Sequence, residues 1–412
     1  MKSKPADGKP APLSSTDYLK QVLTARVYDV AVESDLDPAR VLSRRLHNRI
    51  FLKREDQQPV FSFKLRGAYN KMAHLTPEQL KAGVICASAG NHAQGVALGA
   101  HKLGSRAVIV MPTTTPQVKV DAVKALGGEV VLAGDSYSDA YDHAVKLQAA
   151  QGLTFIHPFD DPLVIAGQGT IGLEMLRAQP QLDTLVIAVG GGGLIGGIAT
   201  AARALKPGVE IIGVQTSRFP AMFNAIKGTA HPQGSSTIAE GIAVGQPGKI
   251  TREIVRELVD DLVLVDEGDI EQAVLMLLEI EKTVVEGAGA AGLAALLKDP
   301  ARFAGRQVGL VLCGGNIDPL LLAAIIERGM VRAGRLARIR VAARDTPGVL
   351  ARITAVVADA GANVDEVHHQ RAFSTLPAQS VEVELVLQTR NPAHVQAVIA
   401  ALASAGFDAR AY

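Results

Sequence analysis

The amino-acid sequence predicts a doubly wound α/β body followed by a small α+β domain. Short runs rich in Val and Ile alternate with amphipathic helical stretches between residues 84 and 315, which indicates parallel strands joined by crossover helices. The 412 residues include 40 glycines and no Trp, a composition that fits the tight turns of an α/β enzyme. After Arg335 the order of strands and helices changes, which indicates a second fold.

The strands of the body are expected where the apolar runs are continuous, because parallel strands are buried on both faces. Before them, residues from about 19 to 54 read as a helix and then an extended segment. The expected strands are 84–88, 106–112, 129–134, 184–190, 210–215 and 307–315. Ligands of such sheets bind at the carboxyl ends of the strands, so the loops that follow them are candidate sites.

The C-terminal segment is predicted to fold as a βαββαβ unit. Its strands are "LARIRVAARD", "NVDEVHHQRA", "QSVEVELVLQTR" and "FDARAY", and its second helix has Asn391 as a plausible N-cap and Pro392 at its first position. We therefore expect three parts, with the main boundary near 330–336. They are a disordered tail at 1–15, a catalytic body at 16–330 and this unit at 336–412.

Composition limits the class of protein. Lys and Arg number 42 and Asp and Glu 41, so no basic face for nucleic acid is expected. Cys86 and Cys313 lie in apolar runs without metal-ligand spacing, which argues against a disulfide framework and favours a reducing compartment. Neither a signal peptide nor a run of about 18 apolar residues is recognisable. We expect a cytoplasmic protein that binds no membrane.

The run "VGGGGLIGG" (189–197) follows an expected strand and opens a helix, where backbone N–H groups and the helix dipole favour a phosphate. The alternative is a tight turn with close helix–strand packing, although such a turn needs one or two glycines rather than four. Gly191, Gly193 and Gly196 also match the dinucleotide pattern, which requires an acidic residue at the end of the next strand. That strand ends in Gln215, so a single phosphate is favoured.

Two other strand ends carry polar groups. In "ASAGNHAQGVA" (87–97) small residues precede a helix start that suits a carboxylate, and an ordinary helix entry with a solvated His92 is the alternative. In "LVLCGGN" (310–316) Cys313 stands at the carboxyl end of a strand, and a buried structural cysteine is the alternative.

The stretch "SFKLRGAYNKM" (62–72) places Lys64 just before a predicted helix. By itself this lysine is either a surface charge or an amine kept away from water for chemistry. A desolvated lysine loses basicity and becomes a usable nucleophile and base. Arg66 and Lys71 are assigned to the helix surface.

In order and wording these motifs, over about residues 20–330, resemble the fold-type II pyridoxal-phosphate (PLP) enzymes, and specifically the threonine dehydratases, or threonine ammonia-lyases. The resemblance implies that Lys64 of "SFKLRGA" forms the Schiff base with PLP and that Phe63 packs near the ring. "CGGN" resembles the segment whose hydroxyl or thiol faces the pyridine nitrogen, where relatives carry Ser and this sequence has Cys313.

The remaining motifs extend the resemblance. The family's phosphate cup is similar to Gly190, Gly191, Gly192, Gly193 and Leu194. "SAGNHAQG" resembles the substrate-carboxylate loop, in which Asn91 also contacts the 3′-oxygen of pyridoxal. This implies substrate binding by Ser88, Ala89, Gly90, Asn91 and His92.

The resemblance implies a β-elimination. The amino acid displaces Lys64, the freed amine removes the Cα proton, and loss of the β-hydroxyl leads to a 2-oxo acid and ammonia. Serine racemases resemble this chain too, but they carry a serine as a second base where Ala89 stands, which favours a dehydratase.

The roles of two carboxylates, Glu286 and Glu240, are not decided by the sequence. Glu286 in "TVVEGAGA" resembles a family glutamate near the cofactor, and a helix-start carboxylate is the alternative. Glu240 matches one ligand of the racemases' cation site, but Gln246 stands where an acidic ligand would be, so no metal is assigned.

The C-terminal unit resembles an ACT domain, the small module that binds regulatory amino acids, through "DTPGVLARI" (345–353) and "ADAGANV" (358–364). The resemblance implies an effector such as isoleucine or valine at an interface between such domains, and a plain dimerisation module is the alternative. The implied effector residues are Pro347, Gly348, Val349, Leu350 and Asn363.

The leading hypothesis is a PLP-dependent threonine and serine dehydratase of branched-chain amino acid biosynthesis, regulated by an amino acid and assembled as a dimer or tetramer. Threonine and serine differ by one methyl group, worth only about 1–3 kcal/mol in a pocket, so the motifs do not separate them. The alternatives are a serine racemase or serine dehydratase of the same fold, a dinucleotide oxidoreductase and a catalytically silent amino-acid sensor. The intact Lys64, Asn91 and glycine run argue against the sensor.

Overall fold

The computed structural model describes residues 15–371, 377 and 379–411, so the predicted disordered tail lies outside the described residues except for Ser15. The chain divides into two compact units, Met1–Ile317 and Asp318–Tyr412. The domain boundary that we place near 330–336 stays a prediction. The division into compact units groups helix α15 (Pro319–Arg332) with the C-terminal unit.

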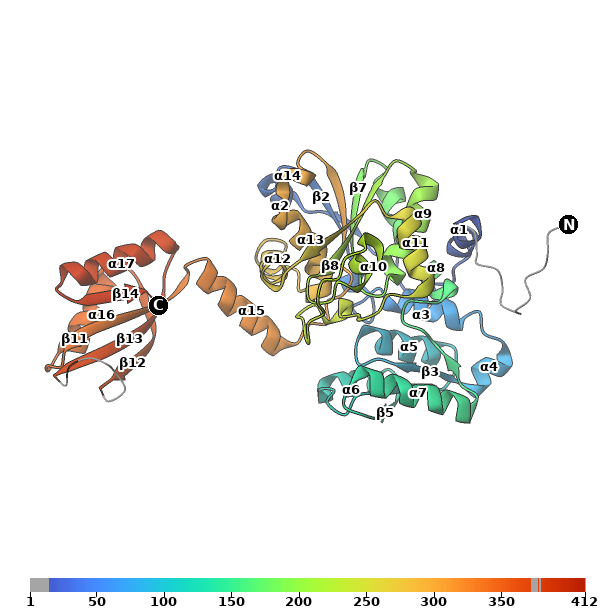
Figure 1. Ribbon diagram of the computed structural model, residues 1–412, viewed down its shortest axis with the longest axis horizontal. Coiled ribbons are helices and arrows are strands. Elements are labelled where there is room, and N and C mark those ends of the chain that lie inside the picture. Colours follow the sequence, from blue (N-terminus) through green and yellow to red (C-terminus); the bar gives the residue numbers. More distant parts are fainter. Residues whose placement is uncertain (1–14, 372–376, 378, 412) are drawn as a thin grey trace. The chain divides into compact units, whose positions relative to one another are not determined.

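The N-terminal unit contains two parallel sheets (Figure 1). The large sheet has the order β1-β2-β10-β7-β8-β9, and only its edge strand β1 runs antiparallel to its neighbour. The small sheet has the order β5-β4-β3-β6 and is entirely parallel. The large sheet comprises β1 (Leu36–Pro38), β2 (Arg49–Lys53), β7 (Thr184–Ala188), β8 (Glu210–Thr216), β9 (Asp261–Val265) and β10 (Gln307–Val311). The small sheet comprises β3 (Val84–Ala87), β4 (Ala107–Met111), β5 (Glu129–Leu132) and β6 (Thr154–Phe155).

All six predicted strands of the body are present, and the doubly wound α/β prediction is confirmed. Three strands were not predicted. β1 is a three-residue edge strand, β6 has two residues, and β9 is a half-exposed edge strand, so none of them gives a continuous buried run.

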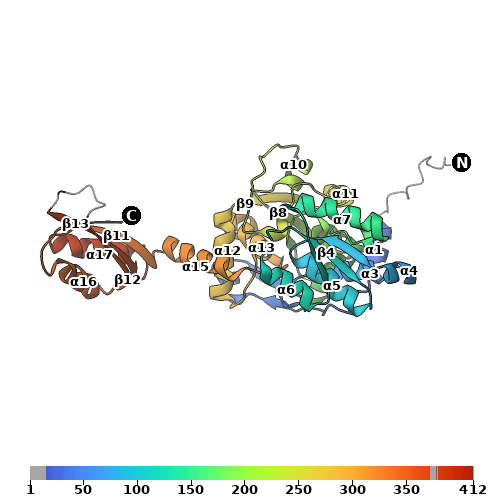
Figure 2. The ribbon, with the colours of Figure 1, turned by 90° about the horizontal axis from the view of Figure 1, so that it is seen from below.

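Helices cover both faces of each sheet. Figure 1 shows helices on either side of the large sheet. A Cβ at Gly309 would meet Met175, while the next residue, Leu310, lies against Gly292 on the opposite face. Figure 2 shows helices beside the small sheet. There, Ile109 packs on one face and Val108 on the other. The helices of this unit are α1 (Ser15–Leu23), α2 (Arg40–Arg45), η1 (Glu55–Gln57), α3 (Lys64–Met72), α4 (Pro77–Ala82), α5 (Asn91–Lys102), α6 (Gln117–Ala125), α7 (Tyr137–Gln151), α8 (Pro162–Ala178), α9 (Gly193–Leu205), α10 (Ala221–Lys227), η2 (Glu240–Ile242), α11 (Lys249–Leu258), α12 (Glu267–Ile280), α13 (Gly287–Lys298) and α14 (Pro300–Phe303).

The C-terminal unit confirms the predicted βαββαβ order. Its antiparallel sheet has the order β12-β13-β11-β14, and alternate residues such as Val341 and Val383 pack against the helices through Ile353 and Val398. Its elements after α15 are β11 (Leu336–Arg344), α16 (Val349–Asp359), β12 (Asn363–Gln370), β13 (Ser380–Gln388), α17 (Pro392–Ser404) and β14 (Asp408–Ala411).

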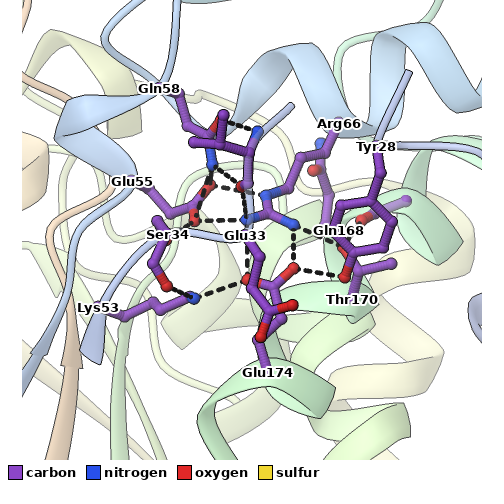
Figure 3. A network of polar contacts seen from close by, with 12 residues as sticks. Tyr28, Glu33, Ser34, Lys53, Glu55, Gln58, Arg66, Gln168, Thr170 and Glu174 are labelled. Atoms are coloured by element: carbon purple, nitrogen blue, oxygen red, sulfur yellow. Dashed lines mark hydrogen bonds and ion pairs between the residues drawn. The ribbon is translucent and has the colours of Figure 1, made fainter. Parts of the chain in front are cut away.

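Arg66 of α3 is fully buried, so its assignment to the helix surface was wrong (Figure 3). Its guanidinium lies between two carboxylates, with Nε 2.8 Å from Glu55 Oε2 and Nη2 2.9 Å from Glu174 Oε2. Lys53 Nζ lies 2.6 Å from the same oxygen of Glu174. Lys71 is also not a free surface charge, because it pairs with Asp161 at 2.8 Å.

These four buried groups, two cations and two carboxylates, form a charge-balanced cluster that connects β2, η1, α3 and α8. Each charge needs its partners, since an unpaired charge in the interior costs far more than a surface one. Lys64 begins α3, two residues before Arg66, so the cluster fixes the position of the helix that carries it.

We predict that Arg66→Ala lowers the free energy of unfolding by about 3–5 kcal/mol, because it leaves two buried carboxylates with one cation. Denaturant unfolding of the full chain measures the effect. Arg106→Ala is the control, since Arg106 pairs with Glu129 at the surface and should cost less than about 1 kcal/mol. Equal losses in the two variants would contradict the prediction.

Candidate active site

Lys64 lies partly buried at the start of α3, with its Nζ donating to the carbonyl oxygen of Pro158 at 3.0 Å. Its Nζ stands 5.3 Å from the centroid of the Phe63 ring. Burial lowers the pKa of Lys64 to about 8, while Cys313 and Glu286 act in the opposite direction. A substantial share of this amine is therefore neutral near physiological pH, as a nucleophile or base requires.

Cys313 follows β10, and its backbone is joined to the segment that carries Lys64. The Phe63 N–H donates to the Cys313 carbonyl at 3.2 Å, and Ser62 forms a bridge with Gly314. The side chain is buried, and burial raises the pKa of the thiol above its ordinary value. The thiol therefore stays neutral, and it can only offer the weak hydrogen bonds of an S–H group.

Asn91 opens α5 and contacts residues from two distant segments. Its Nδ2 donates to Glu286 Oε1 at 2.8 Å, and its Oδ1 accepts from Asn316 Nδ2 at 2.7 Å. Asn316 also donates to the Val60 carbonyl at 2.9 Å, which holds its amide in place. Sequence reasoning missed Asn316, although it is the last letter of the quoted "CGGN".

Glu286 stands at the N-cap position of α13, yet its side chain makes no capping bond and turns to Asn91 instead. The helix-start alternative therefore does not describe this side chain. Burial raises the pKa of Glu286 to about 7, and the hydrogen bond from Asn91 acts in the opposite direction. The carboxyl therefore takes up a proton much closer to neutral pH than an ordinary glutamate does.

In the predicted carboxylate loop, residues 88–92, some residues lie at the entry to α5 and others pack inward. At the entry to α5, Ser88 Oγ accepts from Gly90 N at 3.3 Å, and a Cβ on Gly90 would meet no atom within 4 Å. Ala89 packs on the core of the small sheet. His92 turns inward, with Nε2 2.8 Å from the Ile156 carbonyl, and burial lowers its pKa to about 3. His92 is therefore a buried neutral ring and not a solvated turn residue.

The glycine run lies between β7 and α9, and its backbone amides are the fit test for a phosphate. Gly191, Gly192, Gly193 and Leu194 are buried, and in the described part of the chain none of their N–H groups donates to a protein acceptor. Buried amides without partners cost free energy, and the first amides of a helix are a favourable place for an anion. This local structure fits a phosphate group.

The four glycines also have a packing reason that the sequence did not reveal. A Cβ would lie 3.1 Å from Ile242 Cα at Gly190 and 2.3 Å from the Phe159 ring at Gly191. At Gly192, where φ is 96°, it would lie 2.7 Å from Thr251 Cβ. The number of glycines therefore reflects close neighbours as well as a ligand, and the unpartnered amides carry the phosphate assignment.

One segment, residues 156–161, contacts three parts of this site. Ile156 accepts from His92, and Pro158 accepts from Lys64. Phe159 packs against the glycine run, and Asp160 accepts from the first amides of α11. Lys64, the carboxylate loop and the glycine run are thus held around one stretch of backbone.

Glu240 does not join a metal cluster. It is exposed and pairs with Lys119 at 2.7 Å. Among the residues that the structure describes, no group of three or more His, Cys, Asp or Glu side chains could hold a metal ion. Within the same residues, no helix is both long and apolar enough to span a membrane.

The predicted effector residues lie at opposite ends of the C-terminal sheet. Asn363 pairs with Gln388, which also pairs with Leu336 at the start of β11. The turn at 347–350 follows the other end of β11, where Arg344 pairs with Ser380. One copy of this unit therefore does not bring the two groups together.

The fold and this site define the class. A partly buried lysine with a lowered pKa, unpartnered amides at a helix start after β7 of the large sheet and an amide–carboxyl pair at the helix start after β3 of the small sheet are the parts of a PLP-dependent enzyme. Residues 31–314 match the family of pyridoxal-phosphate dependent enzymes, and residues 334–405 match the ACT domain.

Relatives narrow the class. The chain is 45% identical to an L-threonine ammonia-lyase of Thermotoga maritima, over 90% of this chain and 92% of that one. It is 44% identical to the L-threonine dehydratase biosynthetic IlvA of Burkholderia multivorans, over 96% of this chain and 78% of that one. The chain belongs to the threonine ammonia-lyase family of PLP-dependent enzymes.

Solved structures agree with this family. The processed form of threonine deaminase isoform 2 from Solanum lycopersicum has a TM-score of 0.74 and 42% identity, covering 78% of this chain and 91% of that chain. A maize serine racemase has a TM-score of 0.71 and 32% identity, covering 76% of this chain and 98% of that chain.

We predict that Lys64 of the apoprotein reacts with trinitrobenzenesulfonate with a midpoint near pH 8, because only the neutral amine is nucleophilic. The labelled peptide is quantified by mass spectrometry as a function of pH. A midpoint near the ordinary lysine pKa of about 10.4 would show that burial does not act on this amine.

Proposed function

We propose that this protein converts L-threonine to 2-oxobutanoate and ammonia by β-elimination, and that it accepts L-serine by the same route. The observation that carries the proposal is Lys64, an amine with a pKa of about 8. Its Nζ donates to Pro158, in the segment that also contacts the glycine run and the carboxylate loop. PLP, when bound, supplies the electron sink for the charge left at Cα.

The roles of the other residues follow from their positions. We assign the amides of Gly190 to Leu194 to the phosphate of PLP, and the entry to α5, with Ser88 and Asn91, to the substrate carboxylate. Lys64 removes the Cα proton, and a pKa near the working pH lets the same amine release that proton afterwards. We assign the Cys313 thiol, which is neutral and buried, to the pyridine nitrogen of PLP, to which it would offer a weak hydrogen bond.

Racemisation is the second candidate, because a serine racemase is among the similar structures. A racemase needs a proton carrier on the face opposite Lys64. The methyl group of Ala89, packed on the core of the small sheet, has no proton to transfer. Dehydration is therefore the function that these residues support best.

We further propose that the C-terminal unit binds an amino-acid effector, isoleucine or valine, between two copies of the chain. The turn at 347–350 and Asn363 lie at opposite ends of one sheet, so a site that uses both needs a second unit. This requires a homo-oligomer, a dimer or a tetramer. The name of the Burkholderia relative supports a role in amino-acid biosynthesis, and the two free cysteines support a reducing cytoplasm.

We predict that Lys64→Ala lowers 2-oxobutanoate formation from threonine by about 10²–10⁴-fold, because the base that removes the Cα proton is lost. Product is measured by a coupled assay with purified protein. Lys81→Ala, a substitution on the exposed side of α4, is the control and should leave the rate unchanged. Turnover by Lys64→Ala at the wild-type rate would remove Lys64 from this role.

We predict that a chain ending at residue 333 keeps threonine turnover but loses its response to isoleucine and valine. The catalytic residues all precede the division at Ile317, whereas the ACT match begins at residue 334. Steady-state kinetics of the full and shortened chains, each with and without effector, measure the difference. A response that survives the truncation would place the effector site elsewhere.

A further inference from the structure

Thr251, the third residue of α11, contacts the glycine run from outside. Its side chain is fully buried, and its hydroxyl donates to the Gly191 carbonyl at 2.6 Å. Its Cβ lies so close to Gly192 that a side chain at that glycine would not fit. Neither the sequence motifs nor the reaction uses this hydroxyl, yet it bonds the middle of the run whose amides lack protein partners.

Thr251 is itself held by Asp160. The N-cap of α11 is Gly248, which has no side chain to cap the helix. The carboxylate of Asp160 caps the helix instead. It accepts hydrogen bonds from the amides of Lys249, Ile250 and Thr251 at 2.9, 2.9 and 3.2 Å. A carboxylate at a helix N-terminus is favoured by hydrogen bonding and by the helix dipole.

The glycine run needs such support because glycine loses more conformational freedom on ordering than any other residue. If four glycines became ordered only when the ligand binds, the entropy lost on ordering them would weaken the binding of that ligand. The Gly191 carbonyl accepts the short bond from Thr251 and a longer one, 3.3 Å, from Gly248 N. Both donors belong to the start of α11, which Asp160 fixes.

We propose that Thr251, held by Asp160, is a positioning residue that keeps the glycine run in its phosphate-binding conformation before the cofactor arrives. The proposal rests on the proposed function, in which this run holds the phosphate of PLP. Pro158 and Asp160 are two residues apart, so one segment positions both the amine and the phosphate cup.

Thr200 provides a matched control. Its hydroxyl is also buried, and it donates to a backbone carbonyl, that of Gly196, at 2.9 Å. This bond lies within α9 and does not touch residues 190–193. Thr200→Val therefore removes a buried threonine hydroxyl of the same kind without removing a contact to the glycine run.

The experiment compares apoprotein of the full chain carrying Thr251→Val, Thr251→Ser or Thr200→Val. PLP binding is titrated by absorbance, and inorganic phosphate is titrated by its shift of the melting temperature. We expect Thr251→Val to weaken both ligands about 5-fold, the range for one lost hydrogen bond. Thr251→Ser should restore wild-type affinity, and Thr200→Val should keep it even if the apoprotein melts earlier.

Wild-type affinity in Thr251→Val, equal weakening in Thr200→Val, or no rescue by Thr251→Ser each overturns the proposal. If Thr251→Val does not fold, Asp160→Asn replaces it, because loss of the charge at the start of α11 should weaken both ligands in the same sense, and unchanged affinity then overturns the proposal. Failure of the proposed function looks different, since the wild-type chain itself would then not bind PLP.

Discussion

The guanidinium of Arg66 lies between the carboxylates of Glu55 and Glu174, and the position of the Lys64 amine depends on it. A buried charge is tolerated only when its partners arrive together, so α3, η1, β2 and α8 must pack in one arrangement. Lys64 is two residues away on the same helix. The cluster fixes the start of α3, so that the Lys64 amine faces Pro158. Burial of the same region lowers the pKa of Lys64.

Loops at the ends of parallel strands supply the rest of the site. The segment 156–161 contacts Lys64, His92, the glycine run and the start of α11, so parts that are far apart in sequence share one stretch of backbone. Two of the buried groups in this site therefore have pKa values near neutral pH. Lys64 and Glu286 have pKa values of about 8 and 7, and the thiol of Cys313 remains protonated. Proton transfer at ordinary pH suits such a set.

Much of this could be predicted from local patterns. The buried strands, the βαββαβ unit, Lys64, Asn91 and the glycine run follow from continuous apolar runs and from short motifs. Arg66 could not be placed, because its two carboxylates come from positions 11 residues before it and 108 residues after it, and no local pattern encodes such pairing. Asn316, Pro158 and Thr251 were missed for the same reason, since their contacts with the site are long-range or use a backbone carbonyl.

The sequence by itself determined the class of fold, the family motifs and Lys64 as the candidate amine, since these depend on residue types at fixed spacings along the chain. Only the tertiary structure decided which charges are buried, why each glycine of the run is required and which groups hold the loops around Lys64. Burial and pairing are properties of segments that meet in space. Their energies depend on desolvation and on the distance to a partner, and neighbouring residue types along the chain determine neither quantity.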